Sequence, residues 1–149
     1  MEIRKATIND LDKLISNRIK FVSDIGDISS PDEFYKLTSN YFKNHIESDD
    51  FIIWLAVDKD EIVATVEVCI YEIMPTLSNM SGKTGFLLNV WTDENYRRQG
   101  LATKLINNVI CDAKKAGVRS IGLKATDQGR FVYEKLGFKM ISNQMEIII

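Results

Sequence analysis

Residues 89–104 have the types and spacing best suited to chemistry. An apolar, strand-like run at 86–91 leads into a short polar turn with two arginines and a glycine at 97–100, and a helix follows from about Leu101. The first amide N–H groups of a helix have no acceptor within the helix, and the helix dipole places partial positive charge beside them. Together with the arginines and a glycine that lets a ligand approach the backbone, they predict a site for an anion such as phosphate. A tight strand–helix turn with two solvated arginines would leave the same pattern.

The turn differs from two common phosphate loops, because it matches neither G-x-x-x-x-G-K-[ST] nor G-x-G-x-x-G. Residues 97–102, Arg-Arg-Gln-Gly-Leu-Ala, instead resemble the R/Q-x-x-G-x-G/A signature of the GNAT superfamily of acyl-CoA-dependent N-acetyltransferases. Residues 90–96 are similar to the strand and turn before that signature, and residues 125–138 resemble the family's late helix, which commonly ends Y-E-K-L-G-F. The resemblance is close over 51–140 and loose over 1–25.

The resemblance implies where acetyl-CoA, the co-substrate of the family, would bind. The strand before the signature is usually bulged and splayed from its neighbour, which places Val90, Trp91 and Thr92 along the pantetheine arm. The Val90 N–H would also polarise the thioester carbonyl. Beside Arg97, backbone amides around the signature would bind the CoA pyrophosphate. In this chain those amides belong to Arg98, Gln99, Gly100, Leu101, Ala102 and Thr103.

The late helix supplies further residues that the resemblance places at the cofactor. Thr126 falls at a position often held by Asn in the family, and Gly129 follows it closely. Lys135 would reach the 3′-phosphate of the nucleotide. A solvated lysine on a helix surface is the alternative for Lys135.

Tyr133 is the candidate for proton transfer, because the matching tyrosine of the family meets the thioester sulfur. A phenol has a pKa near 10 and a thiol near 8.5, so full transfer from an ordinary tyrosine to a thiolate is uphill by about 2 kcal/mol. Tyr133 is therefore expected either to donate a hydrogen bond to developing negative charge or to have a lowered pKa. A tyrosine that packs beside Phe131 and Leu136 is the structural alternative.

The amine acceptor needs a base, since an alkyl ammonium with a pKa near 10.4 costs about 4.6 kcal/mol to deprotonate at pH 7. Glu67 is the first candidate, because it interrupts an apolar strand-like run at 62–70. At the strand period of two it shares a face with Thr65 and Cys69, and a carboxylate there needs an explanation. A strand residue on a solvated face is the alternative for Glu67.

Other chemistries find little support among the remaining polar residues. Glu72 and Asp93 are weaker candidates for the base, and His45, the only histidine, lies at a polar helix end. One histidine and two distant cysteines cannot form a closed metal shell, so no metal site is predicted. Nothing near His45 suggests a nucleophile system, so we expect the amine to attack the thioester directly.

The hydrophobic pattern predicts the elements that position these residues. Apolar residues at helical spacing predict helices that start near Thr7, with Asp10 in the cap, near Ser30 and near Leu101, and a short helix that ends near 136–137. The element order predicts an α/β fold in one GNAT-like domain, 1–149, with a twisted, mixed and largely antiparallel sheet of about six or seven strands and about four helices. The predicted strands lie near 2–4, 51–57, 62–70, 86–91, 120–125, 138–142 and 145–149.

Composition limits the class of protein. The 149 residues are 45% apolar and 27% charged, close to the average for packed domains. A net charge of −2 argues against a nucleic-acid partner, and no apolar stretch approaches the ~18 residues of a membrane span, so no membrane association is expected. Two isolated cysteines suit a reducing compartment. The chain is expected to be cytoplasmic, as a monomer or homodimer.

The combined reading is an N-acetyltransferase that moves the acetyl group of acetyl-CoA to a primary amine of a small molecule or peptide. Residues 21–50 and the loop at 74–84 are expected to form the acceptor side. Two alternatives stay open. A catalytically silent acyl-CoA-binding sensor or regulatory module would keep the cleft without turnover, and a nucleotide- or phosphate-metabolite-binding domain would use only the helix end near Gly100.

Overall fold

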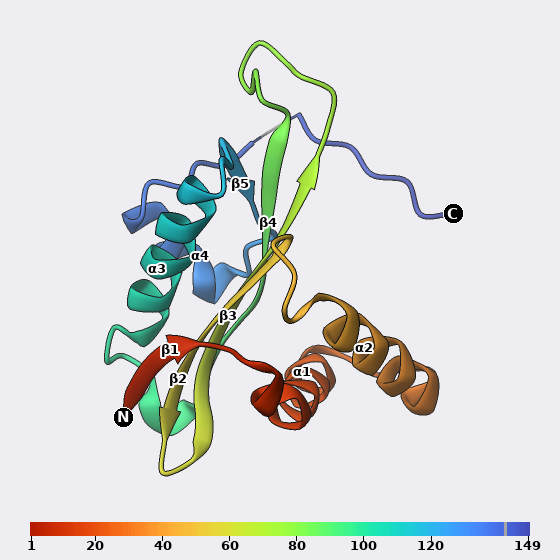
Figure 1. Cartoon of the computed structure of the whole chain (residues 1–149), viewed down its shortest axis with the longest axis vertical. Helices are drawn as coiled ribbons and strands as arrows, with labels where there is room; N and C mark the ends of the chain where they lie inside the picture. The colour runs from red at the N-terminus through yellow and green to blue at the C-terminus, as the bar shows by residue number, and fades with distance from the viewer. Residues whose placement is uncertain (142) are drawn as a thin grey trace.

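Five strands form one twisted sheet in the computed structural model, which describes residues 1–141 and 143–149 (Figure 1). Neighbouring strands from β1 to β4 pair antiparallel, and β4 pairs parallel with β5. The sheet is therefore mixed and largely antiparallel, as predicted. In spatial order the strands are β1 (Glu2–Lys5), β2 (Phe51–Asp58), β3 (Glu61–Glu72), β4 (Lys83–Thr92) and β5 (Ser120–Gly122).

Helices cover both faces of this sheet (Figure 1). The helices α1 and α2 pack on one face, while α3 and α4 pack on the other. The number of helices and their starting points agree with the sequence pattern. Their bounds are α1 (Leu11–Ile25), α2 (Pro31–His45), α3 (Leu101–Lys115) and α4 (Asp127–Lys135), with short 3-10 turns η1 (Ile8–Asp10) and η2 (Glu94–Tyr96).

The central strand β3 sends alternate side chains to the two faces. Val66 and Val68 are fully buried in the larger apolar core, against α3. Thr65 and Glu67 project to the other face, where Thr65 approaches Asn17 of α1. Both faces are buried, and the face under α1 and α2 has the buried polar side chains Thr65, Glu67 and Asn89 at its centre.

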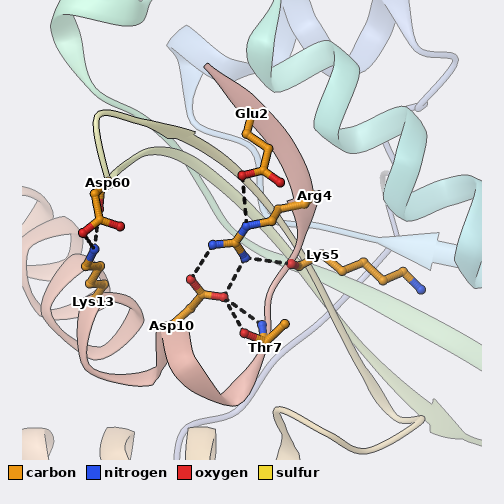
Figure 2. Close-up of polar contacts among 7 residues, drawn as sticks. All are labelled: Glu2, Arg4, Lys5, Thr7, Asp10, Lys13 and Asp60. Carbon is orange, nitrogen blue, oxygen red and sulfur yellow. Dashed lines mark hydrogen bonds and ion pairs between the residues drawn. The ribbon is translucent and has the colours of Figure 1, made fainter.

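A partly buried ion pair fixes the entry into α1 (Figure 2). Arg4 of β1 donates two hydrogen bonds to the Asp10 carboxylate, at 2.7 and 2.8 Å, and the Thr7 N–H donates a third at 2.8 Å. Asp10 is only 6% exposed. The Arg4 hydrogen bonds, together with those from Thr7, lower the pKa of Asp10 to about 2. The predicted cap is thus present, and it also ties β1 to α1.

The two predicted C-terminal strands are wrong. Residues 138–141 and 143–149 form no strand, and residue 142 lies outside the described residues. Isoleucines favour extended backbone, but a strand also needs a hydrogen-bonded neighbour. Past α4 the chain leaves the sheet (Figure 1), and Ile147, Ile148 and Ile149 are each at least 84% exposed. The sheet therefore ends at β5, which is itself shorter than the predicted 120–125 strand.

No helix within the described residues has both the length and the apolar character needed to cross a bilayer. The same residues contain no cluster of three or more His, Cys, Asp or Glu side chains that would hold a metal ion.

Candidate functional site

A bulge in β4 shapes the centre of the site. Thr65 pairs with Trp91 and Glu67 pairs with Leu88, so Val66 alone faces two residues of β4. One of these, Asn89, has a left-handed backbone with a φ of 47°. An extra residue of this kind bends the strand and re-aims its side chains. It lies in the strand that the sequence resemblance marks as bulged.

Beyond the bulge, one edge of β4 is open. The strand β5 pairs only with Thr84, Gly85 and Phe86 of β4, so the two strands separate before β4 ends. Among the residues that the structure describes, no strand therefore pairs with Val90, Trp91 or Thr92 on that edge. The Arg97 Nε donates to the Thr92 carbonyl at 3.2 Å, which occupies one backbone acceptor of the open segment. An open strand edge offers backbone groups to an extended ligand.

The turn that follows β4 presents free amides at the start of α3. Arg98 and Gly100 have left-handed backbones, with φ values of 60° and 76°. The first hydrogen bond of the helix runs from the Lys104 N–H to the Gly100 carbonyl at 3.0 Å. Within the described residues, none of the preceding amides back to Arg98 donates a hydrogen bond. Such a nest of amides at a helix start binds phosphate groups. The amides belong to Arg98, Gln99, Gly100, Leu101, Ala102 and Thr103.

The side chains of this turn are arranged around the backbone cradle. Leu101 is buried in the core and anchors the helix start. The Gln99 Nε2 donates to the Asn95 carbonyl at 3.3 Å, while Arg98 and Gly100 are exposed. A Cβ at Gly100 would meet nothing within 4 Å, so its positive φ rather than a steric contact favours glycine here.

On the face of the sheet that α3 covers, α4 holds Tyr133 half-buried. Its ring packs edge-on to Phe138, with centroids 5.9 Å apart. A Cβ at Gly129 would lie 3.1 Å from the Tyr133 ring, so Gly129 leaves room for it. Within the described residues the Tyr133 hydroxyl has no hydrogen-bond partner, and burial raises its pKa. This direction favours the other of the two expectations for this tyrosine, hydrogen-bond donation from a protonated hydroxyl.

Thr126, at the N-cap of α4, and Lys135, in its last turn, both have local contacts. The Thr126 hydroxyl accepts a hydrogen bond from the Gly129 N–H at 3.1 Å and so caps the helix. The Lys135 ammonium lies 5.6 Å from the centre of the Phe131 ring. Both residues lie on the exposed surface, where a ligand can reach them.

Glu67 lies on the opposite face of the sheet from Tyr133. It is 4% exposed, so the solvated-face alternative is wrong. Its Oε1 accepts a hydrogen bond from the Asn89 Nδ2 at 2.7 Å. Burial raises the pKa of Glu67 to about 7, and the Asn89 hydrogen bond and the charge of Arg18 only partly offset this effect. This carboxyl group therefore exchanges a proton near neutral pH, the range that suits a general base.

Asn89 is the residue that the sequence reasoning missed. It bonds to Glu67, and its carbonyl accepts a hydrogen bond from the Thr65 hydroxyl at 2.8 Å. The Arg18 guanidinium approaches the Asn89 side-chain oxygen at 3.4 Å. The available signal was the same one that identified Glu67, a polar residue inside an otherwise apolar strand. Arg18 gave a similar signal, as a cation within the apolar stripe of α1.

A pocket of about 330 Å³ opens beside Glu67 on the face covered by α1 and α2. Arg18 and Leu88 line it together with residues of α2, a helix within the 21–50 segment that is expected to form the acceptor side. No described residue of the 74–84 loop lines it.

The weaker base candidates lie elsewhere. Glu72 is exposed at the end of β3, and Asp93 caps η2 by accepting a hydrogen bond from the Asn95 N–H at 3.0 Å. His45 pairs with Asp50 at 3.1 Å. None of the three lines the Glu67 pocket.

Comparisons with known proteins find the same architecture. The model of the acetyltransferase (GNAT) family matches residues 20–138. A predicted acetyltransferase from Clostridium acetobutylicum, crystallised with acetyl-CoA, is 26% identical, and the alignment covers 99% of this chain and 95% of that one at a TM-score of 0.90. A GCN5-related N-acetyltransferase from Ralstonia eutropha JMP134 is 19% identical, with 99% and 97% covered and a TM-score of 0.86. Glucosamine-6-phosphate N-acetyltransferase from Arabidopsis thaliana is 23% identical, with 99% and 97% covered and a TM-score of 0.73. Among curated protein sequences, none matches this chain.

Proposed function

The chain belongs to the acetyltransferase (GNAT) family, and from this premise we propose that it transfers the acetyl group of acetyl-CoA to a primary amine by direct attack on the thioester. The observation that carries the proposal is the open edge of β4, which leads into the free amides of Arg98–Thr103. An extended ligand with a diphosphate at one end fits this sequence of backbone donors. Acetyl-CoA has that form, and a 26% identical relative was crystallised with it.

The open edge and the turn that follows it would hold acetyl-CoA mainly through backbone groups of the protein. The amides around Gly100 bind the diphosphate, and Arg97 and Arg98 add charge. The Val90 N–H polarises the thioester carbonyl, where negative charge develops as the amine attacks. Acetyl-CoA supplies an acetyl group activated as a thioester. We assign the outer part of the nucleotide to Thr126, which caps α4, and to Gly129 and Lys135 within that helix.

Glu67 takes a proton from the amine as the nitrogen–carbon bond forms, directly or through water. Its raised pKa of about 7 supports this role, because the carboxyl group is substantially ionised at neutral pH and still basic enough to accept a proton. Its position on the face under α1 and α2 supports entry of the amine from that side. Asn89 orients the carboxyl group through the 2.7 Å hydrogen bond.

Tyr133 donates a hydrogen bond to the sulfur as the carbon–sulfur bond breaks and CoA leaves. Because its pKa is raised, it remains protonated, and complete proton transfer is uphill by more than the ~2 kcal/mol of an ordinary tyrosine. Hydrogen-bond donation is therefore the role we assign to it. Free Cys69 and Cys111 are compatible with a reducing compartment, and we propose the cytoplasm as the place of action.

A thiol-release assay with acetyl-CoA and a panel of primary amines tests the proposal. Release that depends on the amine is the expected result, and Tyr133→Phe should lower kcat by ~10²–10⁴-fold with little change in acetyl-CoA affinity. Calorimetric binding of acetyl-CoA without thiol release from any amine would instead indicate a silent acyl-CoA-binding module. Equal stabilisation against thermal unfolding by ATP and by CoA would instead indicate a general phosphate site.

Two glycines of α3 provide a matched test of the diphosphate cradle. Gly100 and Gly117 flank the two ends of this helix with φ values of 76° and 85°. Alanine at either position should destabilise the fold by ~1–2 kcal/mol, because both require left-handed backbone. Only Gly100→Ala should also weaken CoA binding in calorimetry. Equal CoA affinity in the two variants would contradict the cradle.

A further inference from the structure

The pocket beside Glu67 has a distinctive lining. Most of its wall is apolar, and much of it is aromatic, whereas its hydrogen-bonding groups are few. At about 330 Å³ it is at the small end of ligand pockets, which usually measure about 300–1,000 Å³. The apolar part of the wall consists of Phe34, Leu37, Tyr41, Phe42, Phe51 and Leu88.

Three of the four polar side chains that line the pocket already have a partner within the described residues, and the fourth is the Thr38 hydroxyl. The Tyr41 hydroxyl lies 3.1 Å from the Cys69 sulfur, and burial raises the pKa of Tyr41 above its ordinary value. Arg18 and Glu67 both contact Asn89, which lies behind the pocket wall. The Thr38 hydroxyl alone cannot match the several hydroxyl groups of a sugar, and a buried polar group without a partner costs free energy.

The charges of the pocket also restrict the acceptor. Glu67 is the only carboxyl group among the described residues that line it, and Arg18 is the only cation. One carboxylate can pair with one ammonium group. The second and third ammonium groups of a polyamine would find no acid in this pocket, and Arg18 would repel them.

We propose that the acceptor is a primary amine on a small apolar carbon skeleton, an alkylamine or arylalkylamine. The amine nitrogen lies at Glu67, and the carbon skeleton packs against the wall that α2 supplies. This inference rests on the proposed function, because it assigns the acceptor class to the same site.

A series of straight-chain amines measures the apolar contact directly. Burial of one CH₂ group contributes ~0.8 kcal/mol, which corresponds to about fourfold in kcat/KM. From propylamine to pentylamine, kcat/KM should therefore rise by about 15-fold. Pentylamine and 2-phenylethylamine should both be better acceptors than spermidine or glucosamine 6-phosphate in the thiol-release assay.

Two exposed residues of α2 provide a matched pair of variants. Leu37 lines the pocket and is 60% exposed, while Tyr35 is 53% exposed and does not line it. Neither substitution by serine removes a buried side chain, so both variants should fold. Leu37→Ser should flatten the dependence on chain length, whereas Tyr35→Ser should keep it.

Calorimetric titration of the same amines into the protein without acetyl-CoA gives a second readout. Binding that strengthens from propylamine to pentylamine, and less steeply in Leu37→Ser, supports the acceptor class even if no amine releases thiol; that combination would reject the proposed function alone. Faster turnover with spermidine or glucosamine 6-phosphate than with pentylamine would overturn the acceptor class, and so would the absence of chain-length dependence in both measurements. If thiol release still depends on an amine, neither outcome contradicts the proposed acetyltransferase function.

Discussion

The surroundings of Asp10 and Glu67 differ although both carboxyl groups are almost completely buried, at 6% and 4% exposure. Asp10 receives two hydrogen bonds from the Arg4 guanidinium, at 2.7 and 2.8 Å, and its pKa falls to about 2. Glu67 receives one hydrogen bond from the neutral Asn89 amide, and its pKa rises to about 7. Burial is nearly the same, but the pKa values move in opposite directions.

The difference shows that solvent exposure alone does not decide what a carboxyl group does, because the partner and the desolvation around it also matter. A charged, bidentate donor offsets the cost of desolvation, so Asp10 stays ionised and stabilises the junction of β1 and α1. A neutral amide offsets only part of that cost, so Glu67 keeps its proton until near neutral pH. The first group is suited to structure and the second to proton transfer.

The largest effect is expected on kcat, which should depend on the Glu67 carboxyl group and not on Asp10. Glu67→Gln should lower kcat by ~10²–10⁴-fold, because the amide cannot accept the proton of the amine. The matched control is Glu61→Gln, an exposed position at the other end of β3, which should leave kcat unchanged. Steady-state rates with the best amine of the panel measure both. A Glu67→Gln enzyme with normal kcat would remove this residue from the mechanism.

The same substitution should stabilise the fold at alkaline pH. Because the pKa of Glu67 is raised from 4.5 to about 7, the native state holds its proton longer than the unfolded state does, and wild-type stability falls as pH rises through that range. Above pH 7 the ionised group costs roughly 3 kcal/mol, which Glu67→Gln should recover. Urea unfolding at pH 5 and pH 8 compares the two proteins. Identical pH dependence in both would refute the raised pKa.

Asp10 should show the opposite sign. Because its pKa is lowered from 3.8 to about 2, its contribution to stability is present above pH 4 and disappears as pH falls through 2. Asp10→Asn should therefore cost about 2 kcal/mol at pH 7, with activity retained below the melting temperature. Thermal unfolding against pH is the measurement. Asp60→Asn, in the exposed ion pair with Lys13 (Figure 2), serves as control and should change stability little.

The smallest effect tests how the surroundings set the pKa of Glu67. The titratable groups that face it are Arg18 of α1, Tyr41 of α2 and Cys69 of β3, and only Arg18 is a cation. Arg18→Gln removes a charge that favours the ionised carboxylate. The acid limb of kcat/KM against pH should therefore move upward. An unchanged or downward limb would show that another group controls it.

Local patterns in the sequence predict most of the fold, but they do not supply neighbours. The spacing of apolar residues predicts α1 and α3, and the polar turn at Asp58–Asp60 predicts the β2–β3 hairpin, because these features depend on nearby residues. The isoleucines at 147–149 also favour extended backbone. A strand also needs a neighbouring strand to pair with, and that neighbour would have to come from a distant part of the chain. The local sequence pattern does not reveal whether such a neighbour is present.

In the candidate site, too, features that depend on nearby residues were predictable and features that depend on distant neighbours were not. Glu67 and the turn at 97–103 were identifiable from residue type and from the resemblance. Asn89 also stands out as a polar residue in an apolar strand, but its contact with Glu67 was not predictable, because strict alternation would place it on the opposite face from Leu88. The bulge turns Asn89 toward Glu67, and a bulge depends on register with β3. The pocket was equally hidden, since it joins α1 and α2 to the middle of the sheet.

Because β4 separates from β5 before it ends, the sheet divides the molecule into two sides and has an open edge along β4. The amide cradle lies at the start of α3, and the Glu67 pocket lies across the sheet under α1 and α2. In the proposed function, acetyl-CoA and the amine occupy opposite sides of the sheet and need not displace one another. If the proposed function holds, both reactants would be bound together in a ternary complex, so double-reciprocal plots at several fixed amine concentrations should intersect rather than run parallel.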